Sequence, residues 1–204
     1  PSIVFILITL VTLTLLSLNS RAAAVVSSPL IITDNYHDLG QQLWYFEDPG
    51  GMLVFDDVVT TISVERCQRS ETDIPSFGYT DSAYWFRLTL KNPDSEPLKR
   101  VLEIAYPVLD DVGVYVKHHD GRTNRLHSGD QETFNQRPVK HRNFVFELNF
   151  AEYETLELYL RVQTSSALQV PLSLWNERDF WTAEQKELGL QGIYFGIMLV
   201  MVLY

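Results

Sequence analysis

The sequence predicts an all-β fold, a β-sandwich or jelly roll built from short antiparallel strands. Three observations lead to this prediction. Short runs of apolar and polar residues alternate with a period of two, as they do in half-buried strands. Turn residues (Pro, Gly, Asn and Asp) separate these runs at nearly regular spacing. Both ends of the chain lack the alternation and are continuously apolar, so the predicted β domain lies between two hydrophobic segments.

The amino-terminal segment resembles a secretory signal. Residues 3–18 are apolar apart from a few Thr and Ser, and Ala22-Ala23-Ala24 follows at the small-residue spacing of a cleavage site. We predict a signal peptide over residues 1–24, cleaved after about Ala24. An uncleaved signal anchor is the alternative. In both cases the middle of the chain is expected to be exported.

The predicted strands follow one another through the middle of the chain. The first lies in "QQLWYFED", and a short helix or turn is expected over residues 56–62. "RVLEIAYP" adds a strand, and Asp120-Gly121 is a strong hairpin signal. Alternation predicts these inward-facing residues: Tyr84, Phe86, Leu88 and Leu90; Val112, Val114 and Val116; Phe144, Phe146, Leu148 and Phe150; Leu156, Leu158, Leu160 and Val162; Leu168, Val170, Leu172 and Leu174.

After Trp175 the strand period disappears, and the chain runs without proline into an apolar stretch. Within residues 188–204 only Gln191 is strongly polar, whereas a membrane-spanning helix needs about 20 apolar residues. Gly192 and Gly196 have the spacing that lets membrane helices approach closely. A buried core helix is the alternative, but it would show a polar face. We therefore predict a juxtamembrane helix and the start of a first transmembrane helix over residues 177–204.

The predicted domain, residues 25–176, has the size of a single domain. The formal net charge of the chain is -10, which argues against nucleic acid as a partner. Cys67 is the only cysteine, so no disulfide can form within the chain. Hydrophobic residues make up 46% of the sequence, and stability is therefore expected to come from the core.

Motifs for catalysis are absent from the sequence, which contains no G-x-S-x-G, no H-E-x-x-H and no glycine-rich phosphate loop. Asp56-Asp57 and Asp110-Asp111 are adjacent pairs, and neighbouring residues in a strand point to opposite faces. His118-His119 lacks further ligands, which favours a solvated loop over a metal site. We expect no catalysis, no cofactor and no metal ion in this part of the protein.

Aromatic, guanidinium and amide side chains occupy the outward positions of the predicted strands. They are Trp85, Arg87, Tyr159, Arg161, Gln169 and Trp175. An aromatic ring can cover the apolar face of a sugar, while guanidinium and amide groups bind hydroxyls or a carboxylate. The alternative is that these positions are divided between two sheets and are merely solvated, because alternation identifies a face and not a pocket.

The segment "RPVKHRNFVFELNF" places a basic cluster before a strand. Arg142 lies two residues before Phe144 and is therefore expected to point to the same, apolar face of the strand. A charge in that position needs a partner. The partners we consider are Asp110, Asp111 and Glu147 in a structural salt bridge, or an acidic ligand. In the binding hypothesis the ligand contacts Trp85, Arg87, Asp110, His141, Arg142 and Gln169.

Several long motifs resemble a known family. They are "YWFRLTLKNPDSEP", "LEIAYPVLDDVGVYV", "SGDQETFNQRPVKHRNFVFELN", "LYLRVQTSSALQVPLSLW" and "GIYFGIMLVMVLY". From about Leu43 onwards the chain is similar to the second extracellular-domain type of the bacterial seven-transmembrane receptors with diverse intracellular signalling modules. The resemblance implies a periplasmic jelly roll similar to carbohydrate-binding modules. It also implies seven membrane helices and a cytoplasmic output, commonly a histidine kinase or a diguanylate cyclase.

Two functions therefore remain open. The first is a ligand-sensing domain of a receptor in the bacterial inner membrane, with residues of about 25–185 in the periplasm and a carbohydrate or small acid as ligand. The second is a protein-interaction or dimerisation module without a small ligand, for example in a homodimer. A concave pocket lined by Trp85, Arg87 and Arg142 would favour the first function, and a flat exposed aromatic patch the second.

Overall fold

The computed structural model describes residues 28–61 and 66–204; the predicted signal peptide, residues 1–24, lies outside them. The strands are β1 (Leu30–Ile31), β2 (Tyr36–Asp38), β3 (Trp44–Asp48), β4 (Gln68–Arg69), β5 (Ser76–Tyr79), β6 (Ala83–Lys91), β7 (Leu98–Ile104), β8 (Asp111–Lys117), β9 (Thr123–Ser128), β10 (Phe144–Phe150), β11 (Thr155–Gln163), β12 (Ala167–Gln169) and β13 (Leu172–Trp175). The helical elements are the 3-10 turns η1 (Gly40–Gln42) and η3 (Phe134–Gln136), the short helix α2 (Phe55–Thr61) and the long helix α3 (Glu177–Leu203).

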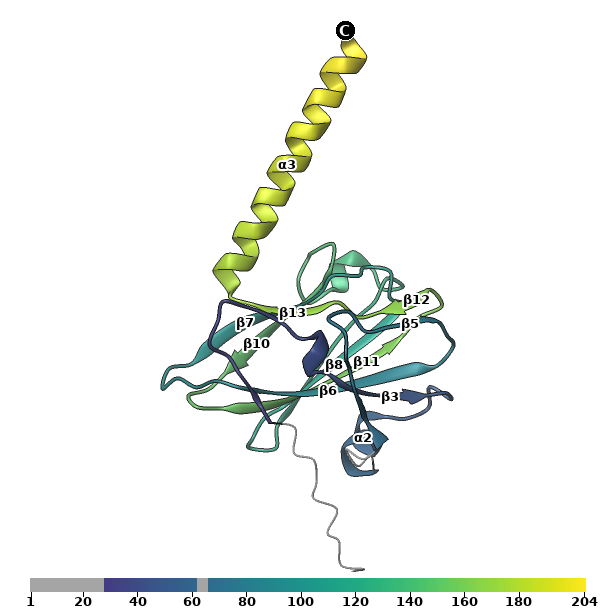
Figure 1. The fold of residues 1–204 in the computed structure, drawn as a ribbon, viewed down its shortest axis with the longest axis vertical. Coiled ribbons are helices and arrows are strands. Elements are labelled where there is room, and N and C mark those ends of the chain that lie inside the picture. Colours follow the sequence, from purple (N-terminus) through teal and green to yellow (C-terminus); the bar gives the residue numbers. More distant parts are fainter. Residues whose placement is uncertain (1–27, 62–65) are drawn as a thin grey trace, which may run out of the picture.

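The strands form two facing sheets and a two-stranded ribbon of β12 and β5 (Figure 1). The large sheet has seven strands in the order β4-β3-β6-β11-β8-β9, and β1 pairs in parallel with the end of β6. The small sheet has four strands in the order β10-β7-β13-β2. The other pairings are antiparallel, and the predicted all-β fold is confirmed.

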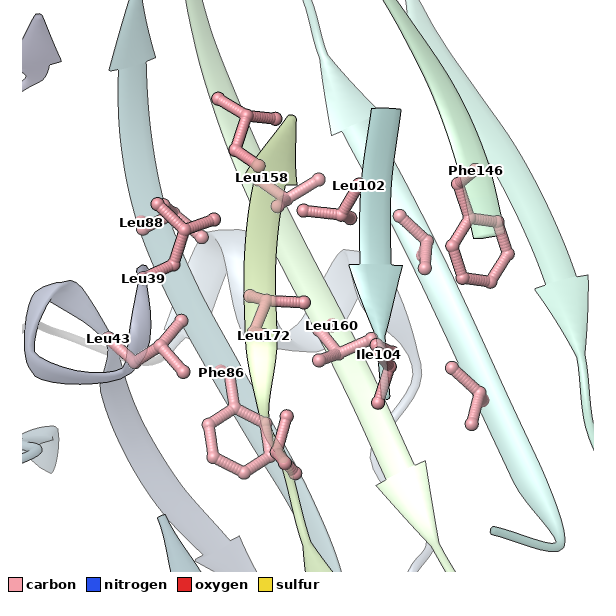
Figure 2. Packing of buried hydrophobic residues seen from close by; sticks show 14 of the residues in the cluster. Leu39, Leu43, Phe86, Leu88, Leu102, Ile104, Phe146, Leu158, Leu160 and Leu172 are labelled. Atoms are coloured by element: carbon pink, nitrogen blue, oxygen red, sulfur yellow. The ribbon is translucent and has the colours of Figure 1, made fainter. Parts of the chain in front are cut away.

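An apolar core fills the space between the sheets, and Figure 2 shows side chains of both sheets meeting there. Every inward residue that alternation predicted within 84–90, 112–116, 144–150, 156–162 and 168–174 belongs to this core. Burying each large apolar side chain contributes about 1.5–3 kcal/mol. The core therefore holds the domain together without a disulfide.

Strand register decides which side chains face outward. β6 and β11 pair with Leu88 opposite Leu158 on the inner face and Arg87 opposite Tyr159 on the outer face. A slip of one residue would turn the apolar set out to solvent, so burial of the leucines fixes the register. The same register aligns the outward side chains of neighbouring strands in rows across the large sheet.

The segment 168–175 departs from the prediction of one strand. It is split into β12 of the ribbon and β13 of the small sheet. Pro171 lies at the break, and it has no N–H with which to continue a ladder. The carbonyl of Pro171 accepts from the backbone N–H of Ala105 at 3.0 Å, while Val170 donates to the carbonyl of Pro75 at 3.0 Å. The chain thus changes sheets at the proline.

The two α-helices lie on opposite faces of the sandwich (Figure 1). α2, predicted over residues 56–62, spans seven residues and packs on the outer face of the large sheet. α3 starts at the end of β13, runs unbroken for 27 residues and extends away from the sandwich. It is long and apolar enough to cross a membrane, and its apolar stretch is not buried against the rest of the chain.

Candidate functional site

The basic segment before β10 contacts α3. Arg142 donates to Glu184 at 3.2 Å and also pairs with Glu187. Its hydrogen bond to Glu187 raises the pKa of Arg142, and the same bond holds the pKa of Glu187 below its ordinary value. Arg137 braces this segment by donating to the carbonyls of His141 and Arg142 at 2.9 and 3.0 Å. The segment is therefore a docking point for the helix.

His141 is buried at this junction. Its Nδ1 accepts a hydrogen bond from the backbone N–H of Asn143 at 3.1 Å, which places the proton of a neutral ring on Nε2. Nε2 lies 2.9 Å from a carboxylate oxygen of Glu184, but it makes no well-directed hydrogen bond within the described part of the chain. We therefore regard the contact with Glu184 as electrostatic.

Apolar packing secures the start of α3. Phe180 is 1% exposed and packs against Val101 and Val145 on the outer face of the small sheet. The side chain of Asn176 caps the helix by accepting from the N–H of Arg178 at 3.0 Å. Cap, aromatic anchor and ion pairs together fix the first turns of α3 to the sandwich.

A buried carboxylate underlies the same junction. Glu103 of β7 accepts from the side-chain amide of Asn143 at 2.7 Å and from the indole of Trp175 at 3.0 Å. These partners lie at the start of β10 and the end of β13. The carboxylate thus ties together three strands of the small sheet beside the helix start.

The structure corrects the proposed salt-bridge partners of Arg142. We considered Asp110, Asp111 and Glu147, whereas the actual partners are Glu184 and Glu187 of α3. The sequence gives no sign of this pairing because α3 returns over a segment that lies 42 positions earlier. A ligand contact by His141 and Arg142 remains a prediction, and any such ligand would meet the helix as well.

The outer face of the large sheet carries the predicted row of aromatic and basic residues. Trp85, Arg87, Tyr159 and Arg161 share this face, as alternation predicted. Trp85, however, is 0% exposed, since α2 covers it. A sugar cannot stack on Trp85 while α2 is in place.

Two of the outward residues, of which Gln169 was a predicted binding residue, lie elsewhere, as the alternative interpretation expected. Gln169 belongs to the ribbon of β12 and β5, and Trp175 lies on the outer face of the small sheet. The outward positions are thus divided between separate surfaces.

Arg87 belongs to an ionic network that is partly open to solvent. Its Nη2 donates to Glu157 at 3.1 Å, and the guanidinium lies over the Tyr159 ring at 5.4 Å. Lys117 approaches the other oxygen of Glu157 at 3.7 Å, and the Tyr159 hydroxyl donates to this carboxylate at 2.7 Å. Burial alone would raise the pKa of Glu157, but the Tyr159 hydrogen bond and the two cations hold it below its ordinary value.

Asp110 lies at a hollow of 350 Å³ at one end of the large sheet, lined also by Gln163 and Ser165. Its carboxylate accepts from the backbone N–H of Ser165 at 2.7 Å, and this bond lowers the pKa of Asp110. The neighbouring Asp111 pairs instead with Arg161 and His127. Asp110 is therefore separate from the junction that contains His141 and Arg142.

The structure does not bring the predicted ligand residues into one pocket. None of the hollows described for residues 28–61 and 66–204 is lined by Trp85, Arg87 and Arg142 together. In the same ranges, no group of three or more His, Cys, Asp or Glu is placed to hold a metal ion. Sequence reasoning missed Glu157, although its outward parity beside Tyr159 was visible, and it missed Glu184, whose partner lies far away in the sequence.

Comparison with known proteins identifies the family. The family model described as "7TMR-DISM extracellular 2" matches residues 40–176, which is more than half of the chain. A search of curated proteins returned no match. The matched region ends where the apolar helix α3 begins. The chain therefore belongs to the 7TMR-DISM extracellular 2 family and contains the periplasmic sensor domain of an inner-membrane receptor.

Proposed function

We propose that this domain binds a carbohydrate or a carboxylate-bearing small molecule in the periplasm and relays its occupancy through α3. The observation that carries the proposal is the direct attachment of α3 to the small sheet through Phe180 and through the Arg142 ion pairs. The output on the cytoplasmic side is a histidine kinase or a diguanylate cyclase, in keeping with the family resemblance.

The physical basis of the relay is a rigid connection. A continuous helix transmits a rotation or a small axial shift, whereas a flexible linker absorbs both. A ligand can bias the receptor only through its differential affinity for two arrangements of the junction. The contacts of Glu184 with His141 and Arg142 are where two such arrangements would differ, because an ion pair can exchange partners without unfolding a strand.

The test uses a matched pair of substitutions just beyond the docked turns of α3. In the full-length receptor, Leu188→Pro removes one helix hydrogen bond and kinks the helix, whereas Leu188→Ala preserves it. Leu188 is 60% exposed, so neither change disturbs the sandwich. Cells are exposed to a panel of neutral sugars and sugar acids, and output is measured as receptor phosphorylation or as cyclic diguanylate.

We expect Leu188→Ala to keep the response and Leu188→Pro to lose it, with binding of the stimulating compound unchanged in both. A full response in Leu188→Pro would show that α3 is not the transmitter. Contacts between the sandwich and other membrane loops would then be the better account. Failure of the whole panel to bind the purified receptor would favour the dimerisation module instead, which measurement of the oligomeric state would test.

A further inference from the structure

A row of aromatic and basic side chains crosses the outer face of the large sheet in register. Trp44 lies opposite Arg87, Arg87 opposite Tyr159, Tyr159 opposite Tyr115, and Tyr115 opposite Arg125. Side chains that face each other across paired strands have Cβ atoms about 5 Å apart. The row is thus a continuous surface built by five adjacent strands.

Helix α2 covers only one part of this row. Phe55 of α2 stacks on Tyr115 with ring centroids 4.6 Å apart and meets the edge of Tyr159 at 5.4 Å. Trp44, at the other end, is half-buried and belongs to none of the three apolar clusters formed by the described residues. The Arg87 side chain is 30% exposed. The covered part of the row is thus Tyr159 and Tyr115, and its open half is Trp44 and Arg87; Arg125, beyond Tyr115, is exposed.

The open half carries excess positive charge and unused donors. Arg87 and Lys117 share the single carboxylate of Glu157. Arg87 uses Nη2 for this contact, and its buried Nε–H has no hydrogen-bond partner in the described part of the chain. A guanidinium has five N–H donors, so Arg87 has capacity for another acceptor. This local positive charge stands out in a chain of net charge -10.

We propose that Trp44, Arg87, Glu157 and Lys117, named here the open strip, bind a sugar ring that carries a carboxylate. The apolar C–H face of the ring lies on Trp44, the carboxylate meets Arg87 and Lys117, and a ring hydroxyl donates to Glu157. The strip extends from β3 across β6 and β11 to β8, about 14 Å at the usual strand spacing, and the long side chains of Arg87 and Lys117 converge on Glu157 within it. This inference rests on the proposed sensing function and specifies its ligand class and site.

The experiment compares charged and neutral forms of the same sugars. Calorimetric titration of the full-length receptor in lipid nanodiscs uses glucuronate, galacturonate and mannuronate against glucose, galactose and mannose, with acetate as the carboxylate alone. At least one uronate is expected to bind about 10-fold or more tightly than its neutral parent and than acetate, the gain of one charge-assisted hydrogen bond.

Variants then locate the site. Arg87→Gln should abolish the preference for the uronate over its neutral parent sugar. Arg87→Lys keeps a positive charge beside Glu157 and should only reduce this preference. Trp44→Ala should weaken binding of both sugars alike, because it removes the stacking surface. Arg125→Gln removes an exposed guanidinium at the other end of the row, outside the open strip; it is the matched control and should leave both affinities within about 2-fold. Thermal melts of each variant confirm folding.

The inference is wrong if no uronate binds more tightly than its parent, or if the uronate preference survives Arg87→Gln. If the affinity for the uronate is unchanged in both Trp44→Ala and Arg87→Gln, the ligand binds elsewhere on the protein. The proposed sensing function would then remain intact. The proposed relay is tested independently by the Leu188→Pro and Leu188→Ala variants, because they are compared by receptor output and not by ligand affinity.

Discussion

The outer faces of the two sheets are both partly covered by a helix, but the covers are attached differently. On the large sheet, α2 rests on the aromatic row through Phe55 and Val58 and leaves the open strip uncovered. On the small sheet, α3 combines a buried phenylalanine with ion pairs from a separate loop, and it continues out of the domain. The first face thus keeps polar side chains partly open to solvent, whereas the second is fastened to the helix that leaves the domain.

The largest expected effect tests whether the covered half of the large-sheet face is core. Trp85→Ala should lower the free energy of unfolding by about 3–5 kcal/mol, because a fully buried indole leaves a cavity. Arg87→Ala, two residues along the same strand, should cost about 1 kcal/mol, since its ion pair is partly exposed and Glu157 keeps Lys117 and Tyr159. Urea unfolding followed by circular dichroism measures both. Equal losses would mean that the open strip is as structural as the covered half.

A smaller effect probes how α3 is attached. Glu184→Ala removes a carboxylate that is 13% exposed and contacts both His141 and Arg142, so the docking of α3 should weaken by about 1.5–3 kcal/mol. Glu187→Ala makes the same change in helix propensity at a half-exposed position and should weaken docking less. Amide hydrogen exchange over residues 177–187 reports the opening of the junction. Similar exchange in the two variants would contradict a specific role of Glu184.

The smallest effect concerns pH at the large sheet. Burial disfavours the charged ring of His127, but its hydrogen bonds to Asp111 and Glu132, each of 2.7 Å, prevail and raise its pKa above 6.5. A raised pKa in the folded state stabilises the protein fully below pH 6.5, and this stabilisation is lost as pH rises through the folded pKa.

The side chain of His127 is 54% exposed, so we expect a modest loss of stability over the interval in which pH rises from 6.5 through the folded pKa. His127→Gln should flatten the pH dependence in that interval, measured as melting temperature against pH. An unchanged slope in the variant would assign the pH dependence to another group.

The sequence predicted the faces of strands well, because side chains in a strand alternate strictly and a core needs one continuous apolar set. Val114 and Leu160 illustrate this, since each lies inside as alternation predicts. Alternation placed Trp85 on the correct outer face but could not show that it is buried, because α2, which covers it, comes from a different part of the chain. Alternation failed at Pro171, where one apolar run serves two sheets.

The candidate site was harder to predict for the same physical reason. The charges of Arg142 and Glu184 were visible, but their meeting depends on where α3 leaves the small sheet. Trp44 and Arg87 become neighbours only through the pairing of β3 with β6. Local pattern identifies which residues face outward, while long-range pairing decides which of them meet.

The unbroken start of α3 also sets the height of the sandwich above the bilayer. Residues 177–187, which carry the charged part of the helix, span about 16 Å at 1.5 Å per residue. Phe180 and the ion pairs of Arg142 with Glu184 and Glu187 hold this part against the sandwich, so the apolar stretch starts directly beyond the docked turns. In Figure 1 α2 and β3 lie on the side of the sandwich away from α3, so the large-sheet face that carries the open strip points away from the helix. A molecule approaching from the side opposite to α3 would therefore meet the strip without passing the helix.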